Sequence, residues 1–212
     1  MKIGIIGANG RLGSKVVKKA LDRGNSVRSF IVMGEGSDER EELVMKSLFD
    51  LDVKDLEGLD IVISTFGGGF HADPMINKKA YEKYAELAEK SGLRFIVIAG
   101  AGTLYPNKKH DKREYENMDP ATPLYAISKN ICAGVDMIRN RKDIHWTAVS
   151  PSQQFDFEGI EHAGYIIGTD EELLFNSKGE SYLTYEDMAN ALLDMCESNE
   201  LDHKVVTVLS DI

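Results

Sequence analysis

A chain of 212 residues that is 42% hydrophobic can bury one sizeable core, which predicts a single domain over residues 1–212. Its formal net charge of −10 at pH 7 argues against nucleic acid and anionic membranes as partners, because both need a basic footprint. No apolar run approaches the length that spans a bilayer, and the first residues form a strand pattern rather than a signal peptide. We expect a cytoplasmic protein, a monomer or a homodimer, that acts on a small molecule.

The N-terminus combines an apolar strand pattern, a glycine turn and the start of a helix. Gly7, Gly10 and Gly13 occupy every third position, and a helical pattern runs from residue 11 or 12 to about 23. A helix N-terminus presents unpaired N–H groups and the positive end of its dipole, and glycine lets an anion approach the backbone. The spacing is G-x-x-G-x-x-G rather than the G-x-G-x-x-G fingerprint, but its position between strand and helix predicts a phosphate site.

Strand and helix patterns then alternate along most of the chain. We expect strands over 26–33, 47–51, 61–66, 94–99 and 145–150, and helices over 38–45, 74–90 and 124–140. Beyond residue 151 we expect short strands at 165–168 and 173–175, a helix capped by Thr184 that ends near 196, and a last strand over 204–209. This alternation predicts an α/β fold with a doubly wound parallel sheet, a Rossmann fold, in which residues 151–212 add elements on the substrate side.

In doubly wound sheets, ligands bind at the carboxyl ends of the strands, near the point where the strand order reverses. Four segments follow predicted strands: residues 7–13, 65–69, 99–103 and 150–153. We expect them to converge on one site. The long polar loop over 104–123 is of a length that is typical of functional or disordered loops.

The ordered set of motifs resembles the short-chain dehydrogenase/reductase superfamily in its atypical NmrA-like branch. Within that branch it is similar to bacterial NADH-flavin reductases related to flavin/biliverdin-IXβ reductase. The resemblance spans essentially the whole chain and rests on residues 7–13, 52–53, 100–104, 145–152, 164–168 and 185–189.

This resemblance implies a site for a nicotinamide dinucleotide. Asn9, Gly10, Arg11 and Leu12 would hold the pyrophosphate, Asp52 and Val53 would contact adenine, Thr65, Phe66 and Gly67 would flank the adenosine and its ribose, and Ser150 and Pro151 would lie near the nicotinamide. Gly7, Gly13 and Gly100 complete the predicted cofactor-binding set.

The choice between NAD and NADP depends on the end of the second predicted strand. NAD enzymes commonly place an acidic residue there, about 20 residues beyond the glycine turn, but residues 31–33 are apolar. Relatives often carry an arginine near Val32 for the 2′-phosphate, and this chain lacks it. Arg11 is the remaining candidate for that phosphate, with an exposed first-turn arginine as the alternative, while Glu35 can reach a 2′-hydroxyl. The balance favours NADP by a small margin.

Tyr125 and Lys129 form a Tyr-x-x-x-Lys motif on the helix before the sixth predicted strand. Residues four apart share a helix face. The resemblance implies that the lysine lowers the pKa of the tyrosine, which then exchanges a proton with the substrate. The superfamily's serine corresponds to Gly100 or Ala101, which leaves Thr103 as the nearest hydroxyl. Flavin-reductase-like relatives often lack the pair, because the cofactor carries the chemistry, so a helix-surface role for the pair is the alternative.

These features predict an NAD(P)H-dependent oxidoreductase that moves hydride to a flavin, a quinone or a small carbonyl or sugar-type substrate. Phe155, Phe157 and Tyr165 are candidates for an aromatic wall around a planar substrate, with core packing as the alternative. A non-catalytic, NmrA-like dinucleotide sensor that acts through a protein partner is the competing function. The five histidines show no metal-ligand spacing, so we expect no metal site.

Overall fold

The computed structural model describes residues 1–69 and 72–212 and contains an eight-stranded sheet in the order β3-β2-β1-β4-β5-β6-β10-β8. The strands are β1 (Lys2–Ile6), β2 (Ser26–Ile31), β3 (Glu42–Met45), β4 (Ile61–Ser64), β5 (Arg94–Ile98), β6 (Trp146–Pro151), β8 (Tyr165–Gly168) and β10 (Lys204–Ser210). All pair in parallel except β8, which runs antiparallel to β10. A separate parallel pair joins β7 (Gln154–Asp156) to β9 (Tyr182–Thr184).

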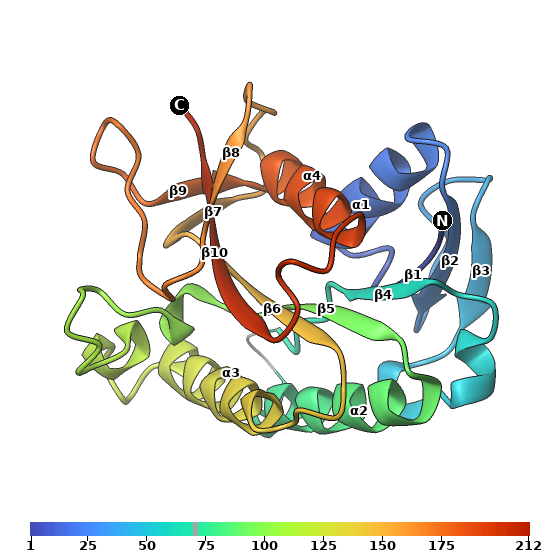
Figure 1. Cartoon of the computed structure of the whole chain (residues 1–212), viewed down its shortest axis with the longest axis horizontal. Helices are drawn as coiled ribbons and strands as arrows, with labels where there is room; N and C mark the ends of the chain where they lie inside the picture. Colours follow the sequence, from blue (N-terminus) through green and yellow to red (C-terminus); the bar gives the residue numbers. More distant parts are fainter. Residues whose placement is uncertain (70–71) are drawn as a thin grey trace.

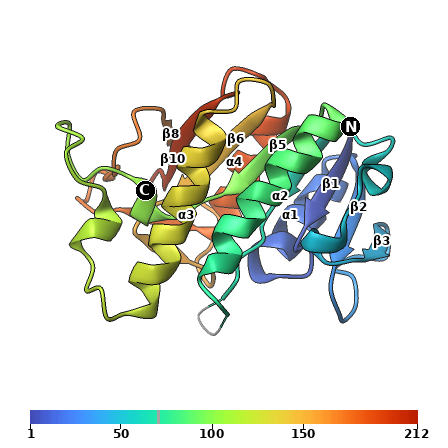
Figure 2. The same ribbon diagram turned by 90° about the horizontal axis from the view of Figure 1, so that it is seen from below.

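Helices cover both faces of the large sheet. Figure 1 shows α1 (Arg11–Asp22) and α4 (Tyr185–Cys196) on one face, and α2 (Met75–Ser91) and α3 (Pro123–Arg139) on the other. The view from below shows α2 and α3 side by side across the sheet (Figure 2). Four 3₁₀ turns, η1 (Leu48–Asp50), η2 (Val53–Leu56), η3 (Ala101–Thr103) and η4 (Glu114–Asn117), lie in the connections.

The unbroken apolar runs of the central strands account for this three-layer arrangement. Successive side chains of a strand point to opposite faces, so a run without polar residues needs cover on both sides. In β4, Ile61 and Ile63 pack into the core under α1 and α4, whereas Val62 packs into the core under α2 and α3. The predicted doubly wound parallel sheet is confirmed. Its strand order reverses between β1 and β4, which is where a ligand is expected.

The predicted helix over 38–45 and the predicted strand over 47–51 are wrong. Residues 42–45 instead form the edge strand β3, which pairs with β2 and places Glu42 beside Arg28, and residues 48–50 form a 3₁₀ turn. The side chain of Glu41 accepts a hydrogen bond from the backbone N–H of Asp38. This bond lies in the segment where the predicted helix would have begun. Ser47 caps the 3₁₀ turn by accepting the N–H of Phe49.

The predicted strand over 173–175 is also absent. Leu173 donates its N–H to Tyr105, and only an isolated bridge between Tyr105 and Glu172 forms there. The three-residue strands β7 and β9 escaped prediction because they are too short for a period of two to be visible. Within residues 1–69 and 72–212, no helix has both the length and the apolar character needed to cross a bilayer.

Candidate functional site

The four predicted strand-end segments meet at the carboxyl edge of the sheet. The Thr65 hydroxyl donates to the carbonyls of Ile6 and Gly7, each at 3.1 Å, which joins the end of β4 to the end of β1. The Ala99 N–H donates to the Val149 carbonyl at 2.8 Å and joins β5 to β6. The expected convergence is therefore confirmed for the strands on both sides of the reversal.

The glycine turn, residues 7–13, has a geometry that larger residues would disrupt. Gly7 has φ +76°, which favours glycine, and its N–H donates to the Phe30 carbonyl at 3.0 Å. A Cβ on Gly13 would lie 2.2 Å from the Gly7 carbonyl oxygen, so only glycine allows α1 to approach the loop this closely. The Gly10 N–H donates back to the same carbonyl at 3.0 Å and closes the turn.

The N-terminus of α1 fits a diphosphate. Gly10 is the N-cap residue and supplies no side-chain hydrogen bond, and the first turn carries no acidic residue. The first N–H groups of a helix have no partner within the helix, and the dipole places partial positive charge there. No acidic side chain in the first turn of α1 offsets that charge, so the turn and the helix together suit an anion.

The Asn9 side chain helps to fix the loop after β2 against the glycine turn. Its side-chain amide donates to the Met33 carbonyl at 2.8 Å, and the Ser37 hydroxyl donates to the Ala8 carbonyl at 3.1 Å. Both bonds hold the loop over residues 32–41 against the glycine turn. The pyrophosphate contact of Asn9 stays a prediction.

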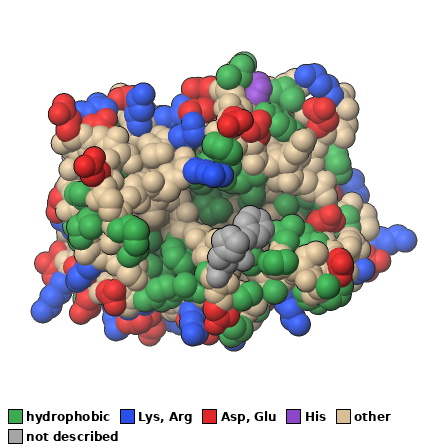
Figure 3. Space-filling model, turned by 180° about the vertical axis from the view of Figure 1, so that it is seen from behind, with side chains coloured by type: hydrophobic (Ala, Val, Ile, Leu, Met, Phe, Trp, Pro, Cys, Tyr) green, Lys and Arg blue, Asp and Glu red, His purple; other side chains and the backbone are tan. Residues whose placement is uncertain are grey.

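A cavity of about 420 Å³ continues from the helix N-terminus along the strand ends. We call it the strand-end cavity. Six predicted cofactor residues line it: Gly10, Arg11, Leu12, Thr65, Phe66 and Gly67. Figure 3 shows a hollow with hydrophobic side chains at its floor and a basic side chain at its rim. Its volume is within the range of small-molecule sites.

Aromatic side chains form one wall of the strand-end cavity. The rings of Phe155 and Tyr185, which both line the cavity, lie with centroids 4.0 Å apart. The guanidinium of Arg11 lies 4.2 Å from the centroid of the Phe157 ring, beside Tyr185. Burial raises the pKa of the Tyr185 phenol above its ordinary value, so it is a neutral hydroxyl at pH 7. Tyr165 lies elsewhere and donates its hydroxyl to Asp194.

The predicted adenine contacts, Asp52 and Val53, lie at the start of the 3₁₀ turn η2. The carboxylate of Asp52 accepts the N–H of Val53 at 2.6 Å and caps η2, so this side chain stabilises the turn. Phe49, which is 37% exposed, packs edge-on against Phe66 with ring centroids 5.8 Å apart. This aromatic pair is a candidate surface for a flat base.

The predicted catalytic residues lie on two elements that pack against each other, Thr103 on η3 and Tyr125 and Lys129 on α3. Thr103 is 2% exposed, and its hydroxyl lies 2.7 Å from that of Ser150 and donates to the Gly100 carbonyl. Tyr125 packs on Tyr115, and the Lys129 ammonium lies 5.9 Å from the Tyr125 ring centroid.

Among the described residues, neither member of the Tyr125–Lys129 pair lines the strand-end cavity. Ser150 and Pro151, expected near the nicotinamide, are buried at the end of β6. The proposed roles of all these residues stay predictions.

Sequence reasoning missed several residues that line the cavity. Asn77 of α2 is 6% exposed, and its side-chain oxygen accepts the N–H of Gly68 at 3.4 Å, which fixes the loop after β4. Tyr81 donates its hydroxyl to the Ile98 carbonyl at 3.1 Å. Polar side chains on the face of a helix that follows a glycine-rich strand end are the signal that could have found them.

Comparison with known proteins gives a matching family model and two similar proteins that align over nearly the whole chain. A family model described as NAD(P)H-binding matches residues 7–199. A Streptococcus pneumoniae protein whose crystal structure is described as that of a "putative NADH-flavin reductase" is 30% identical, with a TM-score of 0.91 and 100% of both chains covered. The "Uncharacterized protein YwnB" of Bacillus subtilis (strain 168) is 28% identical over 212 residues, which are 100% of this chain and 99% of that protein.

A Bacteroides thetaiotaomicron protein described as a "putative epimerase" is 24% identical, with a TM-score of 0.85 over 100% of this chain and 97% of that one. At this identity the likeness shows the fold alone.

Proposed function

The chain belongs to the NAD(P)H-binding family, as its resemblance to atypical short-chain dehydrogenases/reductases predicted, and we propose that it is a reductase that uses NADH to reduce a flavin. The observation that carries the proposal is the continuity of the uncapped α1 N-terminus with an aromatic-walled cavity. The first part fits a diphosphate and the second fits a planar ring, so one site can hold a dinucleotide beside a flat acceptor.

The chain's own residues act by binding and orienting. The α1 N–H groups and Arg11 would hold the diphosphate, and Phe66 with Phe49 would flank the adenine. Phe155 and Tyr185 would stack with the acceptor and exclude water from it. The reduced nicotinamide supplies the hydride, so the protein's contribution is position and a dry surface.

A flavin is favoured over a carbonyl substrate by the placement of the two hydroxyl groups that the sequence predicts as catalytic, those of Thr103 and Tyr125. Reduction of a carbonyl needs a general acid within hydrogen-bond reach of the substrate oxygen. Thr103 is committed to Ser150 and Gly100, and Tyr125 lies outside the strand-end cavity. A flavin spreads the incoming charge over its own ring system and has less need of such an acid.

The charges around the loop over 32–41 support NADH over the NADPH that the sequence favours. Arg40 donates to Asp38 and Asp22, each at 2.8 Å, so its charge is already neutralised. Glu35, Glu39 and Glu41 add negative charge to the same loop. A 2′-phosphate would bring about 1.5 to 2 further negative charges into this region, whereas a 2′-hydroxyl brings none.

The proposal is tested by following NADH consumption with riboflavin, FMN, a quinone and an aldehyde as acceptors. We expect flavin reduction to exceed quinone and aldehyde reduction, with a KM for NADPH at least about tenfold above that for NADH. Tyr185→Leu should raise the flavin KM by about tenfold, in line with the energy of one stacked ring. Tyr165→Phe is the matched control, because this tyrosine lies outside the cavity.

If NADH binds but none of these acceptors is reduced, the proposed reductase activity is wrong. That result would favour the competing function, a dinucleotide sensor that acts through a protein partner.

A further inference from the structure

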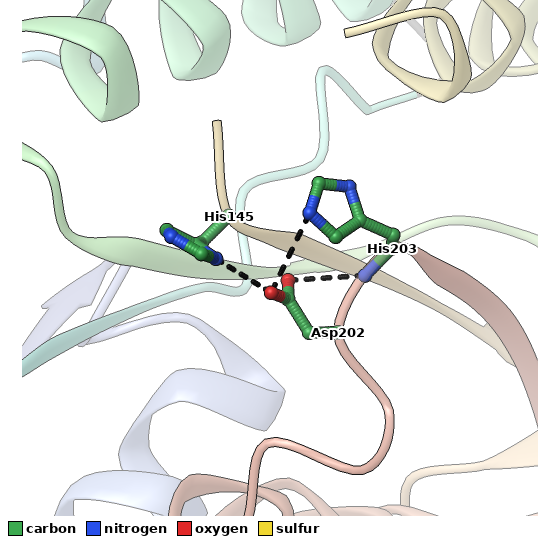
Figure 4. Close-up of side chains that lie close together, drawn as sticks. All are labelled: His145, Asp202 and His203. Carbon is green, nitrogen blue, oxygen red and sulfur yellow. Dashed lines mark hydrogen bonds and ion pairs between the residues drawn. The ribbon is translucent and has the colours of Figure 1, made fainter. Parts of the chain in front are cut away.

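Two histidines and an aspartate gather at the edge of the sheet opposite the strand-end cavity. His145 immediately precedes β6, and Asp202 and His203 immediately precede β10, its parallel neighbour. Figure 4 shows the three side chains pointing toward one another. Each offers one ligand atom, and the three atoms lie within 4.8 Å of one another. Residues far apart in sequence are thus joined by the pairing of two strands.

One of the two distances within this cluster suits a small metal ion, and the other requires a movement of the His145 ring. Nδ1 of His145 lies 2.5 Å from Oδ2 of Asp202, and Nε2 of His203 lies 3.5 Å from the same oxygen. Ligand atoms at about 2.0 to 2.2 Å from a tetrahedral zinc ion are roughly 3.4 Å apart. The His203–Asp202 separation already matches. The His145 side chain is 59% exposed, so its ring is free to turn outward by about 1 Å to complete the set.

The backbone holds Asp202 and His203 in place. The second carboxylate oxygen, Oδ1, accepts the N–H groups of Trp146 and His203, each at 3.0 Å. The other carboxylate oxygen of Asp202, Oδ2, faces the imidazoles of His145 and His203. His203 has φ +57°, an unusual conformation for a non-glycine residue, and its N–H also donates to the Trp146 carbonyl at 2.7 Å. Its buried Nδ1 has no hydrogen-bond partner among the described residues.

We propose that His145, Asp202 and His203 form a binding site for a divalent transition-metal ion such as zinc. Two imidazoles and one carboxylate are a donor set that zinc, nickel and copper ions accept, and solvent can supply a fourth ligand to zinc. The ion clamps the start of β6 to the start of β10, at the edge of the sheet far from the cofactor. Its role is therefore structural, and it does not depend on the proposed reductase activity.

The test titrates untagged, chelator-treated full-length protein with Zn²⁺ by calorimetry, and with Co²⁺ by visible absorption. We expect one equivalent of either ion and a rise in melting temperature on Zn²⁺ addition. His145→Ala and His203→Asn should each weaken Zn²⁺ binding by at least about tenfold and abolish the rise. Asparagine suits the positive φ at residue 203, so this variant is expected to fold.

His110→Ala is the matched control, because His110 and Glu172 form a surface pair at 3.1 Å that belongs to no three-residue ligand cluster among the described residues. It should bind Zn²⁺ like the wild type. Absence of stoichiometric binding by the wild type, or equal binding by all three variants, would overturn the proposal. NADH affinity measured in parallel should be unchanged by His145→Ala, which separates this site from the proposed function.

Discussion

Replacing Gly13 by alanine tests whether the close approach of α1 to the glycine turn creates the cofactor site. The new Cβ would lie 2.2 Å from the Gly7 carbonyl oxygen and 2.9 Å from the Cα of Ala8. Both neighbours are backbone, so no flexible side chain can move aside, and the helix must retreat by roughly 1 Å. Overpacking of this kind costs about 1 to 3 kcal/mol of stability.

The same displacement moves the helix N–H groups away from the anion site. Because binding groups must be held to within about 0.5 Å of their productive positions, we expect the Kd for NADH to rise by ten- to a hundredfold, or about 1.4 to 2.7 kcal/mol. Calorimetry gives this Kd, and a thermal melt gives the stability change separately. Each kcal/mol corresponds to about 2 to 4 °C in a chain of this size.

Gly164→Ala is the matched control for this substitution. A Cβ there meets no atom within 4 Å, and the residue does not have a positive φ, so neither affinity nor melting temperature should change. If Gly13→Ala folds and binds NADH as tightly as the wild type, the close approach does not create the site and the reasoning fails.

Three further predictions concern single side chains. If the guanidinium of Arg11 binds the diphosphate, Arg11→Ala should weaken the binding of NADH and NADPH about equally, near tenfold. Calorimetry measures both affinities. A loss confined to NADPH would assign the guanidinium to the 2′-phosphate. Tyr125→Phe should keep the steady-state rate of flavin reduction within about threefold of the wild-type rate. A general acid contributes about 10²-fold or more to the rate of a reaction that uses one. A larger loss would therefore support the predicted Tyr–Lys mechanism. Asp187→Ala should cost about 3 kcal/mol in urea unfolding at pH 7, because this 1% exposed carboxylate accepts the Ser210 hydroxyl and the His162 N–H. Burial alone would raise the pKa of Asp187, but these hydrogen bonds lower it below its unfolded value. Its stabilisation is therefore complete above about pH 4 and fades as the pH falls through the folded-state pKa. A stability difference between wild type and Asp187→Ala that did not shrink as the pH fell below about 4 would contradict this.

The parts of the fold that local sequence determines were predictable. The apolar run of β4 is compatible only with a strand that is covered on both faces. The spacing of the glycines between β1 and α1 determines the geometry of that turn. The start of α4 followed from its cap, Thr184, whose side chain accepts the N–H of Asp187.

The parts set by tertiary contacts were not predictable. Residues 38–45 have a helix-like composition, but pairing of Leu43 and Val44 with β2 makes the second half a strand. The sequence analysis identified only one of the two stacked rings in the wall of the strand-end cavity. Phe155 was a candidate, whereas the stacking partner Tyr185 lies 30 residues away and comes beside it only through the folding of β7 against β9 and α4.

The residues of the proposed metal site are also brought together by tertiary contacts. His145 and Asp202 are separated by 57 residues, so no local spacing reveals them, and the parallel pairing of β6 with β10 brings their side chains into contact.

The most direct test of the central claim is anaerobic hydride transfer from NADH to a flavin, followed by the absorbance of both molecules. The reductase proposal predicts that catalytic amounts of the protein oxidise NADH and reduce the flavin in equal amounts, and that Gly13→Ala slows both together. NADH and flavin that react no faster with the protein than without it would contradict the proposal.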